Sequence, residues 1–232
     1  RRPLAAIGAR VARFDRRAIV SLAPLGTPAD WQALFGGIAV GLRWVSIDPM
    51  APVEDARCCD EVHDAAWSAV FAGIVRQPFF LRRTLAPPRR AAERAARLLA
   101  AIALLELRLL CAGALFEREL WSRAPSRAVA RTFGEIMAAA TGARFDERRW
   151  FEGADVGLPA SVRLRGLAIA HAIDGALRER CDEDWWRNPR TGPLLQGVWA
   201  RGAAVEATEL PAALGGGPPS LVAAAKALSA SF

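Results

Sequence analysis

Two histidines, His63 and His171, supply the only imidazole groups in this chain of 232 residues. A zinc peptidase of the HExxH type needs two histidines one helical turn apart, which bind one metal ion, and a glutamate between them that activates water. His63 and His171 are too far apart in the sequence to form such a pair. The sequence therefore excludes an HExxH zinc site.

A more local set of potential metal ligands lies in the segment CCDEVHDAAW, which contains Cys58, Cys59, His63 and Asp64. The spacing of these four residues fits no zinc pattern, because adjacent cysteines rarely both reach one ion. We interpret the acidic residues of the segment as carboxylates at the start of a helix, where the helix dipole favours negative charge. A metal site or a reactive thiol at these four residues is the alternative.

A polar helix face is predicted further along the chain, where His171, Asp174 and Arg178 follow one another at spacings of three and four. Asp174 and Arg178 are expected to form an ion pair. We interpret this face as solvated or as an interface, rather than as a catalytic dyad. The neighbouring Trp185 and Trp186 are expected to pack in a corner between helices, with ligand stacking as the alternative.

The formal charge of +7 comes almost entirely from arginine, since Lys226 is the only lysine. Basic residues are scattered among acidic ones and form no tract with interleaved aromatic residues, so nucleic-acid binding is not favoured. The four cysteines do not resemble the framework of a small disulfide-rich secreted domain, and we expect a cytoplasmic protein. The most apolar run, 98–116, contains Glu106 and Arg108, which predicts a buried helix and no membrane span.

Hydrophobic periodicity predicts a mainly α fold, with at most a small β element near the N-terminus. One strand is predicted over 18–22, before the turn-prone PLGTP. Asp30 is the predicted N-cap of a helix that runs to Trp44, although each glycine within it lowers helix propensity by about 1 kcal/mol. Further helices are predicted over 60–76, 78–85, 89–121, 126–140, 164–181 and 189–203, and after the GGGPP of 215–219.

Three segments carry a resemblance to a known family: ADWQALFGGIAVGLRW (29–44), HDAAWSAVFAGIVRQPFFLRRTL (63–85) and CDEDWWRNPRTGPLLQGVWARG (181–202). In their order and spacing they resemble the C-terminal catalytic half of thimet-oligopeptidase-like, oligoendopeptidase F-type zinc metallopeptidases. The resemblance implies a helical zincin-like scaffold over 1–232. It also implies that this single domain is the C-terminal part of a longer chain.

The resemblance also implies which chemical groups have been lost. The first segment matches a family pattern that contains HExxH, and Gly36, Gly37 and Val40 stand at its zinc-binding and general-base positions. Ala65 stands where the family has its third zinc ligand, a glutamate. Glycine, valine and alanine cannot bind zinc or polarise water, so the cofactor of the family is not expected here.

We therefore predict a catalytically inactive metallopeptidase homologue that binds a peptide or a partner protein in a cleft between the helices of 30–44 and 63–76. The residues predicted to line this cleft are Trp44, His63, Asp64, Trp67, Arg163 and Arg165. One alternative is an active hydrolase with a relocated site at Cys58, Cys59, His63 and Asp64. The other is a basic helical interaction module unrelated to peptidases.

Overall fold

The computed structural model describes residues 10–14, 17–22, 25–85, 88–122, 126–153 and 157–230. Most of these residues are helical, so the predicted mainly α fold is confirmed. The sheet of the described residues is a small antiparallel hairpin of β1 (Arg10–Phe14) and β2 (Arg17–Ser21), in which Val11 lies opposite Val20. β2 matches the predicted strand, whereas β1 was not predicted.

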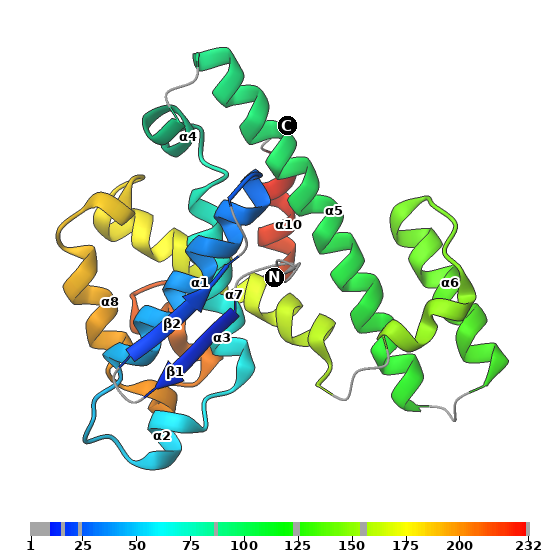
Figure 1. Ribbon diagram of the computed structural model, residues 1–232, viewed down its shortest axis with the longest axis horizontal. Coiled ribbons are helices and arrows are strands. Elements are labelled where there is room, and N and C mark those ends of the chain that lie inside the picture. The colour runs from blue at the N-terminus through cyan, green and yellow to red at the C-terminus, as the bar shows by residue number, and fades with distance from the viewer. Residues whose placement is uncertain are drawn as a thin grey trace, which may run out of the picture.

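The longer helices agree closely with the predicted ranges (Figure 1). In chain order the α-helices are α1 (Pro28–Ser46), α2 (Val53–Arg57), α3 (Glu61–Ile74), α4 (Pro78–Leu85), α5 (Arg89–Ser122), α6 (Arg127–Thr141), α7 (Pro159–Cys181), α8 (Thr191–Trp199), α9 (Leu210–Ala213) and α10 (Leu221–Ser229). Short 3-10 turns are η1 (Glu147–Gly153), η2 (Trp185–Arg187), η3 (Gly202–Ala204) and η4 (Ala207–Glu209). The helix α2 was not predicted.

The start of α1 differs from the prediction by one helical turn. Thr27 is the N-cap, and Asp30 is the third helical residue of a capping box. The carboxylate of Asp30 accepts hydrogen bonds from the backbone N–H of Thr27 (2.7 Å) and of Gly26 (3.0 Å). These hydrogen bonds lower the pKa of Asp30, since they favour its charged form.

Three helices form the centre of the fold, in which α3 packs on α1 and on α7 at small residues. At Gly36 of α1, an added Cβ would lie 2.3 Å from Oγ of Ser68 in α3. At Gly166 of α7, an added Cβ would lie 2.7 Å from Cβ of Ala65 in α3. Gly41 allows β2 to approach α1 in the same way, because its Cβ would lie 3.2 Å from that of Ala18. Gly36 and Gly41 are therefore explained by close packing of α3 and β2 on α1.

Replacing Gly36 by alanine should lower the free energy of unfolding by about 1 to 2 kcal/mol, because the new methyl group overpacks the contact with Ser68. Urea denaturation measures this change. Gly197→Ala in α8 is the matched control: its Cβ meets nothing within 4 Å, so the higher helix propensity of alanine should leave stability unchanged or raised. Adding Ser68→Ala to Gly36→Ala should restore part of the lost stability. If the double variant is as unstable as Gly36→Ala alone, the loss does not come from overpacking against Ser68.

The long helix α5 forms one side of the molecule and connects its parts (Figure 1). Its N-terminal part packs on α4, its middle on α7 and α10, and its C-terminal part on α6 and η1. Phe116 and Leu120 of α5 form a separate apolar cluster there with Val129 and Phe133 of α6. This small apolar core, separate from the main one, holds α6 against α5.

The prediction that α5 is buried over 98–116 is correct for one face of the helix and wrong for the other. Leu98, Ile102 and Leu105 are 62%, 50% and 47% exposed, while Leu99, Leu107 and Leu110 on the opposite face are buried. Periodicity identified the stripe of Leu98, Ile102 and Leu105, but in this part of α5 the core covers the other side of the helix. By length and composition α5 is the one helix among the described residues that could cross a membrane, and 28% of its most apolar window is buried.

Candidate functional site

The helices expected to border a cleft, α1 and α3, are in direct contact. Gly36 touches Ser68, and Val40 keeps only 8% of its surface exposed. Gly36, Gly37 and Val40, at the positions matched to the zinc site, are therefore buried in the packed helices rather than lining an open cleft. Ala65, the position matched to the third zinc ligand, packs on Gly166 of α7.

Asp64 is engaged in a polar cluster at one end of this helix contact. Its Oδ1 accepts hydrogen bonds from Nε (3.0 Å) and Nη2 (2.6 Å) of Arg43 and from Nε1 of Trp44 (3.1 Å). Arg43 is 3% exposed and also donates from Nη1 to Sγ of Cys59 at 3.1 Å. The carboxylate of Asp64 neutralises a buried arginine, which makes its role in this structure electrostatic and structural.

His63 points into the core rather than toward Asp64 or the cysteines. Its Nε2 lies 2.8 Å from the carbonyl oxygen of Val205. Because a carbonyl oxygen only accepts, Nε2 carries the hydrogen and donates the hydrogen bond. Its Nδ1 is then an acceptor, and it has no partner among the residues that the structure describes. Trp67, one turn further along α3, is fully buried against Trp199 with ring centroids 5.3 Å apart.

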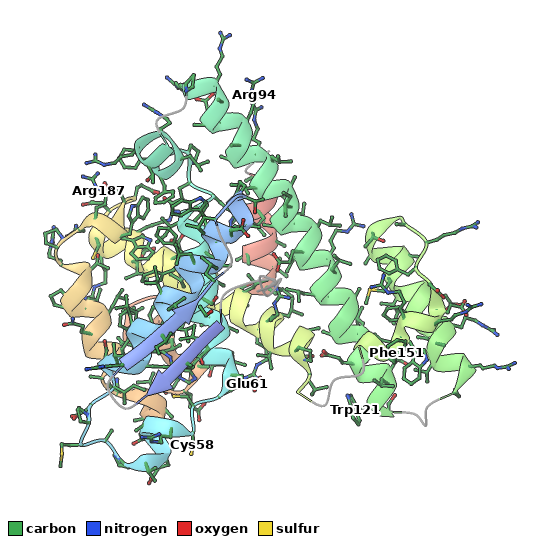
Figure 2. The ribbon with its side chains drawn as sticks, viewed as in Figure 1. Cys58, Glu61, Arg94, Trp121, Phe151 and Arg187 are labelled. Atoms are coloured by element: carbon green, nitrogen blue, oxygen red, sulfur yellow. The ribbon has the colours of Figure 1, made fainter. Side chains whose placement is uncertain are left out.

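The other residues predicted for the cleft lie at the surface of α7. Arg163 forms an ion pair with Glu106 of α5, and Nη2 of Arg165 lies 3.9 Å from a carboxylate oxygen of Asp60. Cys58 is exposed after α2 at the edge of the molecule (Figure 2). Of the six predicted cleft residues, the structure brings together only Trp44 and Asp64, and none of the six lines either pocket described below. Within the described ranges, no three His, Cys, Asp or Glu side chains gather as a metal site would require.

A pocket of about 870 Å³ lies elsewhere, between α3, α4, α5, α7 and α10. The polar residues in its wall include Arg76, His171, Asp174 and Arg178. Its apolar and aromatic lining includes Val70, Phe79, Leu107, Leu167, Trp186 and Leu228. The size and the mixture of apolar walls with a few polar groups are typical of ligand sites.

The polar face predicted from His171, Asp174 and Arg178 therefore borders a pocket. The predicted ion pair is confirmed, with Nε of Arg178 2.7 Å from Oδ2 of Asp174. Arg178 also pairs with Glu183. Burial opposes the charge of Arg178, but pairing with Asp174 and Glu183 outweighs it and raises its pKa. The other carboxylate oxygen of Asp174 accepts from Nε1 of Trp185 at 2.9 Å, so both oxygens are occupied.

Arg76, which follows α3, is the residue of this pocket that the sequence analysis missed. Its guanidinium has no hydrogen bond or ion pair with any residue described. Burial lowers the pKa of Arg76, and the charges of Asp174 and Glu106 oppose this only in part. A Cβ added at Gly73 would lie 3.2 Å from Nη2 of Arg76, so the side chain lies close over the last turn of α3.

Arg76 also lines a second pocket, of about 480 Å³, which lies between α4, α5 and α10. Glu93, Arg97 and Leu228 contribute to its wall. An anion beside Arg76 could therefore be reached from either pocket. The fold and this site define a mainly helical protein with an open pocket, in which the guanidinium of Arg76 has no hydrogen bond or ion pair within the described part of the chain.

No protein-family model, curated protein or solved structure matches this chain.

Proposed function

We propose that this chain is a non-catalytic binding protein, derived from an oligoendopeptidase-type scaffold, that binds the carboxyl end of a peptide in the pocket around Arg76. The observation that carries the proposal is the guanidinium of Arg76, which lies in a pocket with apolar walls and has no hydrogen bond or ion pair with the residues that the structure describes. A partly desolvated arginine gains most from a ligand that brings its own negative charge.

The surroundings of Arg76 explain why the ligand, rather than the protein, would supply the carboxylate. The charge of Asp174 in the pocket wall acts on Arg76, but the hydrogen bonds of this carboxylate come from Arg178 and Trp185. A planar guanidinium can hold a carboxylate through two parallel hydrogen bonds. Phe79, Leu107 and Trp186 would then contact the side chains of the last peptide residues.

We expect short peptides with a free carboxyl end to bind at least about tenfold more tightly than the same peptides with an amidated end, which corresponds to about 1.4 kcal/mol. Arg76→Gln should abolish this difference, because the amide keeps much of the volume and loses the charge. Isothermal titration calorimetry with a small peptide panel measures both constants.

Arg144→Gln, a change of the same type at an exposed position after α6, should leave the preference intact. Equal affinity for free and amidated ends would defeat the proposed ligand. The non-catalytic part of the proposal has a separate test: stoichiometric zinc in the purified protein, together with chelator-sensitive cleavage of the peptides, would overturn it.

A further inference from the structure

The helix α5 has apolar side chains on two opposite faces, and the protein covers only one of them. Leu99, Leu107 and Leu110 are buried, whereas Leu98, Ile102 and Leu105 are about half exposed or more. The three exposed residues follow one another at spacings of four and three, so they form one stripe on the helix surface. A helix that is apolar all round normally has both faces covered.

Arginines continue this stripe toward the N-terminus of α5. Arg90 and Arg94 precede Leu98 at successive spacings of four, and both are exposed. Figure 2 shows Arg94 near the end of α5 that projects beyond the body of the molecule. Other exposed arginines close to this end of the helix are Arg82, Arg83, Arg89 and Arg97.

The positive charge at this end of the molecule is almost uncompensated. Glu93 is the only acidic residue in the segment 82–97, and it pairs with Arg89 at 2.8 Å. Nearby arginines lower the pKa of Glu93, with the hydrogen bond from Arg89 as the main cause. An exposed apolar stripe that ends in a cluster of arginines therefore needs a partner with both apolar and anionic groups.

We propose that this face of α5 docks on the surface of an anionic lipid bilayer. Leu98, Ile102 and Leu105 would enter the boundary between headgroups and acyl chains, while Arg90 and Arg94 would bind lipid phosphates. The helix lies along the surface in this arrangement, because its opposite face is already packed against α7 and α10.

Two other partners fit the same face less well. In an antiparallel pair of two copies, Arg90 and Arg94 of one chain would lie opposite apolar residues of the other, which would bury charges without partners. In a parallel pair, the arginines would lie opposite one another. Nucleic acid would bind the arginines but would leave the stripe of Leu98, Ile102 and Leu105 uncovered.

Co-sedimentation with vesicles tests the proposal, using vesicles of phosphatidylcholine alone and vesicles that also contain phosphatidylglycerol. We expect the whole chain to bind the anionic vesicles at least about tenfold more tightly than the neutral ones. Arg90→Gln/Arg94→Gln should remove most of that difference. Leu98→Ser/Ile102→Ser should weaken binding to the anionic vesicles by about tenfold or more.

Two matched controls separate this surface from general effects of charge and hydrophobicity. Arg127→Gln/Arg131→Gln changes two exposed arginines at the same spacing on α6, and Met50→Ser/Val53→Ser changes two exposed apolar residues near α2. Both controls should bind anionic vesicles like the unchanged protein, and circular dichroism confirms that each variant is folded.

Equal binding to both kinds of vesicle, or equal losses in the controls, would overturn the proposal. A dimer in lipid-free buffer that Leu98→Ser/Ile102→Ser dissociates would assign the face to a second copy instead. Binding to a nucleic acid that depends on Arg90 and Arg94, without any affinity for anionic vesicles, would assign it to that polyanion.

Discussion

Replacing Asp64 by alanine is expected to lower the free energy of unfolding by about 3 kcal/mol, which is near the lower end of the cost of breaking a buried ion pair. The change removes the acceptor for two nitrogens of Arg43 and for the indole N–H of Trp44. Arg43 is 3% exposed and cannot turn to water without disturbing the contact between α1 and α3. The side chain of Asp64 is 32% exposed, so water replaces part of what is lost.

Three variants identify the source of this loss. Asp64→Asn keeps an oxygen acceptor and should cost less than Asp64→Ala. Arg43→Met/Asp64→Ala should regain part of the stability, because the uncompensated buried charge is removed as well. Glu61→Ala, an exposed carboxylate on the same helix, should change stability by less than about 1 kcal/mol. Urea denaturation followed by circular dichroism gives all four values, and equal losses for Asp64→Ala and Glu61→Ala would contradict a role for the ion pair.

The bounds of several helices could be predicted because local signals determine them. Pro78 begins α4, as predicted, and Asp60 accepts a hydrogen bond from the backbone N–H of Val62 as the N-cap of α3. The error at α1 also had a local cause: Thr27 and Asp30 together form a capping box, in which Thr27 rather than Asp30 is the N-cap. The hairpin strand β1 was missed because Arg10 and Arg13 obscure the apolar alternation.

The exposed face of α5 shows what periodicity cannot determine. Leu98, Ile102 and Leu105 have the spacing of a core stripe. Leu99, Leu107 and Leu110 form a second apolar stripe on the other face of the helix. When one helix has two apolar stripes, the sequence does not indicate which of them is buried in the folded protein. The answer depends on where α4, α7 and α10 lie, which is a property of the tertiary structure.

The candidate site was predicted only in part for a related reason. The spacing of His171, Asp174 and Arg178 indicated a polar face, and that face borders the larger pocket. Arg76 carried no such signal, because it is one of 31 basic residues, most of which are exposed. Its distinction is burial without a hydrogen bond or ion pair among the described residues, and this depends on how distant segments of the chain pack around it.

A similar long-range contact explains why α7 begins earlier than predicted. Leu158, before the first turn, has a positive φ of 49° and provides no side-chain cap. Glu117 of α5 provides it instead: its carboxylate accepts from the backbone N–H of Ala160 (2.8 Å) and of Ser161 (3.0 Å). The hydroxyl of Ser161 donates a third hydrogen bond at 2.5 Å. No local pattern contains this cap, since its acceptor lies on another helix.

Replacing Glu117 by alanine should therefore lower the free energy of unfolding by about 2 to 3 kcal/mol, because the part-buried N-terminus of α7 loses a charged acceptor. Glu117 is 3% exposed, so water cannot readily take its place. The loss should also speed hydrogen exchange in the first turn of α7. It should weaken peptide binding as well, since α5 and α7 form opposite parts of the pocket wall through Leu107 and Leu167.

Glu117→Gln keeps one oxygen acceptor and should cost roughly half as much, whereas Glu135→Ala, at an exposed position of α6, should stay within about 0.5 kcal/mol of the unchanged protein. Native-state hydrogen exchange distinguishes a lost cap from a general loss of packing, because only a lost cap acts first on Ala160 and Ser161. Uniform acceleration along α7 and α5 would contradict the capping role. Faster exchange confined to the start of α7 would show that a carboxylate on one helix fixes where the other begins.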